Sequence, residues 1–583
     1  MTWTLLAIAA VVVPTLLAFN VPPSATFLNQ AAALVGWGFW LAVLAMALPS
    51  KAPVGSPGLK ALLAVLAVLF IAAAASPFWT HLPSSLALSS LALIGAAGLA
   101  VAIGAALQSA GLGVPAFRAF CIALVIAGVC SSAIGIVQVF APKLADGTWI
   151  ARSVLDGRAV GNLRQPNHLS SLLLWSLIAA VWLGEARVIS RVGSTVLSLL
   201  FIFVTVLSAS RTGAVGALML GVWGLADRRM SRHGRWLLAA MPIAYIAFWG
   251  GTSLWANLTQ HVFGGETRFS GAGDVSSSRF GIWANTLALI AAHPWLGVGF
   301  GEFNLAWSLT PFPGRPGAFF DHTHDLPLQF AVELGVPLAL LLTGLLMWAL
   351  AAAFRAAFTR PQLRQGEASD SSNLRAAFLM VLMISVHSLL EYPLWYAYFL
   401  LPAAFAFGLC LGAAKPAPST AAGLPSRRPL MLAAWLLACG GLYSVADYSR
   451  VVVIFSPSDT AAPLPQRIAD GQQSWFFAHH ANYAAATTSA DPGKALGAFA
   501  SASHFLLDAR LMQAWATALN DAGDTDRARY VAQRLKEFRN TASADFFEPC
   551  DEAAEPIEPT EPASALPFQC LQPQRALTYK DFR

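Results

Sequence analysis

Charged residues are scarce in this chain of 583 residues. Asp, Glu, Lys and Arg together make up 11% of it, less than half of the roughly 25% found in a typical soluble domain. Hydrophobic residues make up 56%, and the mean hydropathy is +0.60. This balance excludes an ordinary soluble globular protein and predicts a protein that is largely embedded in a membrane.

Several motifs of well-known enzyme classes are also absent. The sequence has no glycine-rich phosphate loop and no His-Glu-x-x-His, and no Asp-x-Asp pair stands in a loop between the apolar runs. ATP hydrolysis and catalysis through a carboxylate-bound divalent metal are therefore disfavoured. The N-terminus has no basic segment before its first apolar run, so we expect that run to be a retained helix and not a cleaved signal.

Apolar runs long enough to cross a membrane recur along the first 447 residues. About 20 helical residues span the ~30 Å hydrocarbon core. One alternate set of connections carries 16 Lys and Arg, and the other carries eight. Because cytoplasmic loops are enriched in basic residues, the first set should be cytoplasmic, with the N-terminus inside and the C-terminal region outside. The predicted spans are 3–19, 27–48, 59–75, 84–107, 117–140, 168–186, 193–210, 212–226, 236–252, 326–354, 376–390, 394–413 and 430–447.

The spans form an N-terminal group, 1–140, and a core, 141–447, with long outer loops at 141–167 and 253–325. A periplasmic helical domain follows at 448–547, where Asp524 can cap the second of two amphipathic helices. This pair resembles one tetratricopeptide unit. The Pro/Glu-rich end, 548–583, is expected to be disordered. The fold class is therefore all-α: a polytopic membrane protein of about thirteen helices with large periplasmic loops and a small helical C-terminal periplasmic domain.

Cysteines are few and scattered. Four of the six lie inside apolar runs and are typical of small buried residues. Cys550 and Cys570 lie in the polar tail. They can pair if that tail is outside the cytoplasm, but their spacing alone leaves the pairing open.

Polar groups at or near membrane depth are costly, and they therefore invite a functional interpretation. Five segments carry such groups, and the predicted topology puts all five on the outer side of the membrane. They are 161–168, 208–213, 276–300, 321–329 and 387–398.

Each arginine in these segments has both a structural and a functional interpretation. Asn167 can cap the sixth span, but that cap does not need Arg164. Arg211 stands where two spans meet, and a side chain that reaches from a helix end to the interface explains it about as well as a ligand does. A serine at 276 or 277 can cap a short helix with Arg279 in its first turn. A cation there opposes the helix dipole, so a bound anion would account for it.

Two histidines, His322 and His324, stand between Asp321 and Asp325. Imidazole and carboxylate groups suit Zn or Mn, although spacing this tight rarely supplies more than two ligands to one ion. The four residues could instead be ordinary polar residues of the membrane interface. Catalysis is the favoured interpretation, because histidine is the side chain best suited to move a proton near neutral pH.

The fifth segment joins an aromatic belt to a carboxylate. Tyr392 and its aromatic neighbours are typical of the membrane interface, whereas Glu391 is less ordinary there. Taken together, the segments offer three arginines and a histidine on one side of the membrane. Arginines clamp phosphates through their planar guanidinium. This set suits a lipid-linked pyrophosphate donor and a hydroxyl acceptor.

At these residues the chain resembles the superfamily of O-antigen ligases and O-oligosaccharyltransferases, which includes the O-antigen polymerases. The shared marks are Arg-Gln-Pro-Asn at 164–167, Ser-Arg-Thr-Gly at 210–213, His-Pro…Gly-x-Gly-x-Phe from His293, and a histidine before the tenth span. The closer resemblance is to PglL-type protein O-oligosaccharyltransferases. His-Thr-His-Asp-Leu-Pro-Leu-Gln at 322–329 is similar to their His-Thr-His-Asn-Leu-Phe-Leu-Gln, and Glu-Tyr-Pro-Leu-Trp-Tyr-Ala-Tyr-Phe at 391–399 matches their late-helix signature. The resemblance covers roughly 150–410.

The resemblance implies transfer of a whole glycan from undecaprenyl pyrophosphate to Ser or Thr of a periplasmic, pilin-like protein, by a multi-pass protein of the bacterial inner membrane. It maps the family's essential histidine to His324 and its pyrophosphate-binding arginines to Arg211 and Arg279, with Arg164 as a third candidate. We expect direct displacement with inversion and no metal or other cofactor. His324 accepts the hydroxyl proton while the arginines stabilise the leaving group.

Five residues are assigned supporting roles: Asp325, His322, Asn167, Glu391 and Tyr392. Asp325 stands where the family has Asn, which could raise the basicity of His324 or change how the acceptor is held. If the tenth span begins near Asp325, two positions correspond to about 200° of helix rotation. The rings of His322 and His324 are then expected to face different sides.

Other functions remain open at the level of sequence. An O-antigen ligase would use the same donor with lipid A-core as acceptor, and an O-antigen polymerase would extend the glycan itself. A transporter or flippase would need paired ionisable residues near span midpoints or inverted repeats, and the sequence shows neither. Membrane lipids are expected neighbours, and no nucleic-acid partner is expected.

Overall fold

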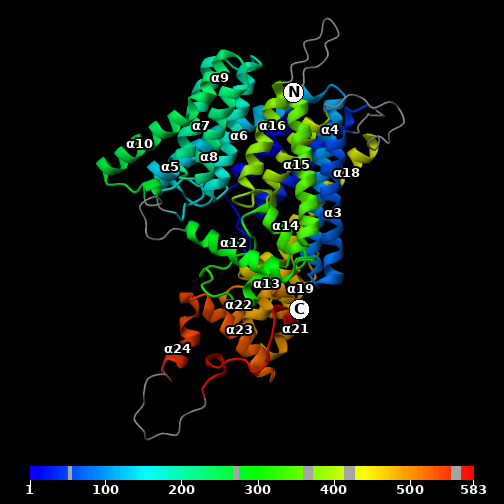
Figure 1. The fold of residues 1–583 in the computed structure, drawn as a ribbon, viewed down its shortest axis with the longest axis vertical. Coiled ribbons are helices and arrows are strands. Elements are labelled where there is room, and N and C mark those ends of the chain that lie inside the picture. The colour runs from blue at the N-terminus through cyan, green and yellow to red at the C-terminus, as the bar shows by residue number, and fades with distance from the viewer. Residues whose placement is uncertain are drawn as a thin grey trace. The chain divides into compact units, whose positions relative to one another are not determined.

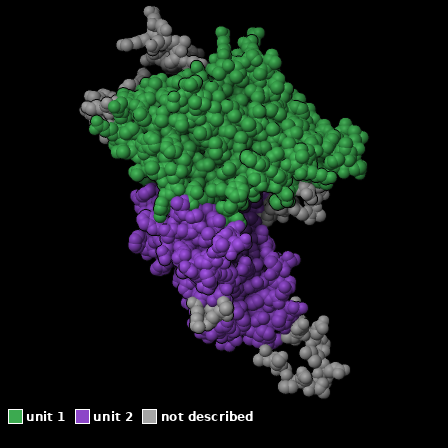
Figure 2. Space-filling view, turned by 180° about the vertical axis from the view of Figure 1, so that it is seen from behind, with its two compact units in different colours: residues 1–67, 93–274, 344–445 green, residues 68–92, 275–343, 446–583 purple. Residues whose placement is uncertain are grey.

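The computed structural model describes residues 1–49, 56–155, 157–266, 275–358, 372–412, 427–489, 492–552 and 566–583. Every regular element within these ranges is an α-helix or a 3-10 helix (Figure 1). The prediction of an all-α fold is confirmed. The chain divides into two compact units (Figure 2): unit 1 is 1–67, 93–274 and 344–445, and unit 2 is 68–92, 275–343 and 446–583. Each unit is described by itself.

Unit 1 consists of apolar helices joined mostly by short connections. Four long helices contribute residues to both units: α3 (Pro57–Trp79), α4 (Ser84–Ser109), α15 (Val336–Phe358) and α18 (Arg427–Phe455). The helices that lie wholly in unit 1 are α1 (Thr2–Leu16), α2 (Phe27–Met46), α5 (Gly113–Phe140), α6 (Pro166–Glu185), α7 (Arg191–Leu207), α8 (Arg211–Ala226), α9 (Arg232–Ala239), α10 (Met241–Thr259), α16 (Ser372–His387) and α17 (Ala397–Leu411), with 3-10 turns η1 (Pro142–Leu144) and η2 (Pro393–Trp395).

Among the described residues, seven helices are long and apolar enough to cross a membrane. Helices α9 and α10, bent by 41° at their junction, would together make an eighth. The chain is therefore a multi-pass membrane protein. Each of the other predicted spans overlaps a shorter apolar helix, namely α1, α7, α8, α16 and α17. The total of thirteen spans stays a prediction.

The core of unit 1 combines large aromatic side chains with very small residues. The rings of Trp37, Trp40 and Phe405 lie with their centroids 5.0–5.7 Å apart, and all three side chains are fully buried. Where α4 meets α17 the residues are small: a Cβ at Gly104 would lie 2.6 Å from a backbone oxygen of α17, and one at Gly408 would lie 2.3 Å from a backbone oxygen of α4. Small residues thus let the two backbones approach closely, as is common between membrane helices.

Unit 2 contains the C-terminal domain and part of the long outer loop that the sequence predicts. The long loop predicted at 253–325 contains helices α12 (Val275–Ala292) and α13 (Phe303–Leu309), and α14 (Leu326–Leu334) follows it. The remaining elements are α19 (Leu464–Gln472), α20 (Ala478–Thr488), α21 (Leu496–Ala502), α22 (Ala509–Asp521), α23 (Thr525–Glu537) and α24 (Ala544–Glu552), with 3-10 turns η3 (Pro492–Ala495), η4 (Thr541–Ser543), η5 (Phe568–Cys570) and η6 (Tyr579–Phe582).

Helices α22 and α23 form the pair that the sequence predicts. Gly523 takes the left-handed turn between them with φ +83°, and the Asp524 side chain caps α23 by accepting from the N–H of Arg527. The apolar faces meet in the core of unit 2, where Leu511 and Val531 are fully buried.

The tenth predicted span is not one continuous helix, so that prediction is wrong. The helix is interrupted at Gly335, whose φ is +84°. The N–H of Val336 donates to the carbonyl oxygen of Pro294 at 2.7 Å. A Cβ at position 335 would lie only 2.2 Å from the carbonyl oxygen of Trp295. The close approach of the 294–295 backbone therefore requires glycine, and it separates the short α14 from the long α15.

The prediction of a disordered tail over 548–583 is wrong for its last part. Tyr579 and Phe582 are buried in the core of unit 2, and a disulfide joins Cys550 of α24 to Cys570 of η5. These contacts tie the last residues to the helical domain. Residues 553–565 lie outside the described ranges.

Candidate functional site

The first polar cluster, in unit 1, begins at the start of α6. Gln165 is the N-cap of this helix: its side-chain oxygen accepts a hydrogen bond from the N–H of His168 at 2.8 Å, and Pro166 occupies the first helical position. The expectation that Asn167 caps the helix is therefore wrong. With Gln165 in that role, the Asn167 amide is available for contacts with other segments.

Asn167 links three segments that are far apart in the sequence. Its Nδ2 donates to Oε1 of Glu391 at 2.9 Å, and its Oδ1 accepts from the hydroxyl of Ser210 at 2.6 Å. All three side chains are buried. The first, second and fifth polar segments predicted from the sequence therefore meet in unit 1. Ser210 was missed as a site residue, although it stands beside Arg211 in the Ser-Arg-Thr-Gly motif.

Ser210 also sets the start of α8. Its Oγ accepts a hydrogen bond from the N–H of Gly213 at 3.0 Å, which makes it the N-cap. Arg211 is consequently the first residue of the helix, where the dipole disfavours a cation and favours an anion. Arg211 also lines a cavity of about 870 Å³ together with Tyr245, Trp249 and Glu266. This volume is typical of a ligand site.

Arg164 and Tyr392 stand in the sequence directly beside Gln165 and Glu391 of the first cluster. Arg164 is exposed and has a left-handed backbone with φ +59°, and its guanidinium donates to the carbonyl oxygen of Ala18 at 2.6 Å. The Tyr392 ring lies 5.9 Å from that of Tyr396, which in turn packs 4.5 Å from the ring of His168. Tyr392 is thus part of an aromatic group next to the start of α6.

The second polar cluster, in unit 2, is the turn before α14. The side chain of Asp325 caps this helix by accepting from the N–H of Leu328 at 2.8 Å, so the helix begins where the sequence predicts. The two histidine rings nevertheless lie together, with centroids 4.3 Å apart. The expectation that they face different sides is wrong, because both residues precede the helix and His324 adopts a left-handed φ of +58°.

The two aspartates that flank this turn have different roles. Asp321 pairs with Nδ1 of His322. Desolvation favours the neutral acid, but the charge and hydrogen bond of His322 outweigh it and lower the pKa of Asp321. Burial raises the pKa of Asp325, and its bond to the N–H of Leu328 offsets this in part. Because Asp and Asn are equivalent N-caps, the departure from the family's Asn is accounted for by capping.

Helix α12 brings a third element to this turn. The indole N–H of Trp283 donates to the carbonyl oxygen of Thr323, between the two histidines, at 2.9 Å. Arg279 lies one helical turn before Trp283 and therefore on the same face of α12. The third and fourth predicted segments thus meet in unit 2. Arg279 is the fifth residue of α12 as described, not part of its first turn, and the side chains at 276 and 277, predicted as caps, lie outside what is described.

Three family comparisons match successive parts of the chain. Residues 159–183 match the family described as Protein glycosylation ligase, 196–343 match O-Antigen ligase, and 375–545 match Virulence factor membrane-bound polymerase, C-terminal. Two curated relatives come from Acinetobacter baylyi: a ComP-specific O-oligosaccharyltransferase, 25% identical over 46% of each chain, and a General O-oligosaccharyltransferase, 28% identical over 43% of each chain. The chain thus matches less than half the length of these relatives.

These matches support a PglL-type member of the Wzy/WaaL superfamily. The matched regions contain both polar clusters: Asn167 falls in the first, Arg211 and His324 in the second, and Glu391 in the third. The third region runs on to residue 545, so the match to known families includes the helix pair α22–α23 as well. The sequence analysis placed the end of the resemblance near residue 410.

No group of three or more His, Cys, Asp or Glu side chains that could hold a metal ion occurs in the described ranges of the chain. Asp321 and His322 are joined to each other, and Asp325 caps α14. Independence from metal stays a prediction.

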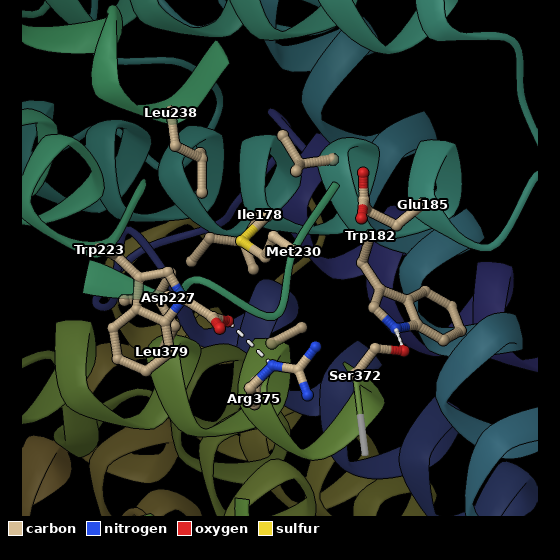
Figure 3. Close-up of a pocket in the computed structure, with 12 residues that line it drawn as sticks. Ile178, Trp182, Glu185, Trp223, Asp227, Met230, Leu238, Ser372, Arg375 and Leu379 are labelled. Carbon is tan, nitrogen blue, oxygen red and sulfur yellow. Dashed lines mark hydrogen bonds and ion pairs between the residues drawn. The ribbon is translucent and has the colours of Figure 1, made fainter. Parts of the chain in front are cut away.

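A further cavity of unit 1 lies among α6, α8, α9 and α16, and Figure 3 shows its lining. Its volume is about 40 Å³, which suits water-sized molecules. Asp227 and Arg375 form a buried ion pair on its wall at 2.9 Å (Figure 3). This cavity is too small for a glycan or a polyprenyl chain.

Proposed function

We propose that this protein transfers a preassembled oligosaccharide en bloc from undecaprenyl pyrophosphate to Ser or Thr hydroxyls of a periplasmic, pilin-like protein. The reaction takes place in the bacterial inner membrane, with the site facing the periplasm. The observation that carries the proposal is the histidine turn at the start of α14, held by Trp283 of the helix that bears Arg279. The names of the two relatives support a protein acceptor.

In the proposed reaction the acceptor oxygen attacks the anomeric carbon, and the bond between that carbon and the pyrophosphate oxygen breaks with inversion. The hydroxyl proton passes to His324. The electron pair of the broken bond stays on the pyrophosphate, where Arg211, Arg279 and Arg164 stabilise its charge. Pyrophosphate is a good leaving group, so the chemistry requires no metal.

A second function is supported by one of the family matches. Residues 375–545 match a family described as a membrane-bound polymerase. The same donor and the same histidine would then act on a sugar hydroxyl, either at the end of a growing O-antigen or on lipid A-core. The acceptor separates these activities, because the chemistry at the anomeric carbon is identical.

The test is transfer by purified protein in liposomes that contain undecaprenyl pyrophosphate glycan, with a pilin-like protein, lipid A-core or a second glycan offered as acceptor. Removing a general base costs about 10²–10⁴-fold, so His324→Ala should abolish transfer at normal protein level. His322→Ala should keep substantial activity. Transfer by His324→Ala at the wild-type rate would refute the assignment, and equal losses in both variants that added metal reverses would favour a metal site.

A further inference from the structure

The turn that carries the two histidines is held at Thr323, the residue between them. The N–H of Thr323 donates to Oε1 of Gln329 at 2.8 Å, and its carbonyl oxygen accepts from Nε1 of Trp283 at 2.9 Å. Its hydroxyl donates to the carbonyl oxygen of Asp325 at 2.7 Å. Thr323 is fully buried. Both backbone groups of this residue are therefore satisfied by side chains from two different helices.

Gln329 is itself fixed by a partner one helical turn further along α14. Its Nε2 donates to Oε1 of Glu333 at 2.9 Å, and Glu333 also accepts from the backbone N–H groups of Gly301 and Phe303. Gln329 and Glu333 are both buried. An oxygen of Glu333 accepts from the amide of Gln329, so the amide lies with its NH₂ toward Glu333 and its oxygen toward Thr323.

We call the hydrogen bonds from Trp283 and Gln329 to the Thr323 backbone the Thr323 clamp. This clamp lies next to an unusual backbone conformation. His324 has φ +58°, a left-handed conformation that residues with a Cβ adopt only where the surroundings enforce it. With Thr323 held at both backbone groups, the backbone from which the His324 ring projects is held in place as well.

We propose that Gln329, oriented by Glu333, and Trp283 are positioning residues that hold His324 for proton transfer. The inference rests on the proposed function, because it assumes that His324 takes the proton. None of the three side chains needs to touch substrate. Their effect falls on the rate of the bound complex, since a displacement of a reacting group by about 1 Å can cost about 100-fold.

The decisive experiment exchanges the amide and the carboxylate. Gln329→Glu places two carboxylates side by side, and Glu333→Gln turns an NH₂ group toward backbone N–H donors. Each single variant should lower kcat about ten- to hundredfold, with the KM for the lipid donor unchanged. The double variant Gln329→Glu/Glu333→Gln again pairs an NH₂ group with a carboxylate and leaves an acceptor oxygen toward Thr323, so it should recover kcat to within about threefold of the wild type. Trp283→Phe, which removes only the indole N–H, should lower kcat less.

Gln513 supplies a matched control in the same unit, because its amide donates to a backbone carbonyl, that of Ala542. Gln513→Ala should leave kcat at the wild-type value. Wild-type kcat in Gln329→Ala, or single variants whose loss the double exchange does not restore, would overturn the proposal. His324→Ala is measured alongside. If it is active, the general-base assignment fails; if it is inactive while Gln329→Ala is fully active, only the clamp fails.

Discussion

Three helices of unit 1 begin with the same sequence pattern, Ser-Arg-x-Gly, at 190–193, 210–213 and 231–234. In each helix the serine is the N-cap, and its Oγ accepts from the N–H of the glycine at 3.0, 3.0 and 3.1 Å respectively. The arginine is then the first helical residue. The shared pattern thus produces the same local structure three times.

The surroundings of these three helix N-termini differ. Ser190 and Arg191, at the start of α7, are exposed. Ser210, at the start of α8, is buried against Asn167, and Arg211 lines the large cavity. Ser231, at the start of α9, is hydrogen-bonded to a carboxylate, because its N–H donates to Glu185 at 2.9 Å. Local sequence therefore decides the cap, and tertiary contacts decide whether the arginine after it lines a cavity.

The largest expected difference between these starts concerns the arginines of α7 and α8. Arg211→Ala should lower transfer at limiting lipid donor about ten- to hundredfold, because hydrogen bonds that involve charged groups are worth ~1.5–3 kcal/mol. Arg211→Lys should restore only part of the loss, because lysine keeps the charge but lacks the planar fork.

Arg191→Ala is the matched control, since it removes the same residue from the same helical position. It should transfer glycan at the wild-type rate. The phosphate role of Arg211 would be refuted if Arg211→Ala equalled the wild type under limiting donor, and equal losses in both variants would point to a general effect of removing a helix-start arginine.

A smaller difference is expected between the two capping serines. Loss of an N-cap costs about 1 kcal/mol of stability, so Ser190→Ala should lower the melting temperature slightly and leave transfer unchanged. Ser210→Ala should lower the melting temperature more and also reduce transfer about two- to tenfold, because a hydrogen bond worth ~0.5–1.5 kcal/mol to Asn167 is lost beside Arg211. Thermal unfolding in detergent and initial rates measure the two effects. Identical behaviour of the two variants would show that the Asn167 contact has no bearing on the site.

The smallest effect on transfer is expected at α9. Glu185→Ala removes the carboxylate that accepts from Ser231 and lines the small cavity of Figure 3. It should lower the free energy of unfolding by ~1 kcal/mol without changing the rate of glycan transfer. A loss of transfer larger than the loss of folded protein would mean that this cavity contributes to the reaction.

Much of the fold could be predicted from the sequence because apolar runs, caps and breaks are local signals. The helix pair α22–α23, with Gly523 in the turn and Asp524 as cap, follows from residues within one short stretch. The helix break at Gly335 could not be predicted from nearby residues, because its cause is the backbone at Pro294 and Trp295, some forty residues earlier in the chain. The ordered structure of residues 566–583 was not predicted either. The apolar side chains that pack it against the core, Tyr579 and Phe582, are few and stand in a polar sequence.

The candidate site shows the same limit at the level of single residues. Sequence motifs predicted Asn167, Arg211 and His324 as site residues, since polar residues beside apolar spans are conspicuous. They did not predict the role of Asn167. Either Gln165 or Asn167 could cap α6, and the hydrogen bond from Asn167 to Glu391 of a distant segment leaves the cap to Gln165. Helical geometry likewise misplaced the histidine rings, because that geometry does not apply to residues before the cap at Asp325.

The sequence by itself determined that the chain is an all-helical membrane protein, where most helices begin and end, and which superfamily it resembles. Hydrophobic length and capping act over a few residues, and a single sequence contains them in full. Only the tertiary structure decided that Asn167 joins Ser210 to Glu391 and that Trp283 and Gln329 clamp Thr323. Buried polar groups must find partners, and those partners come from whichever segments the packing of apolar helices brings near.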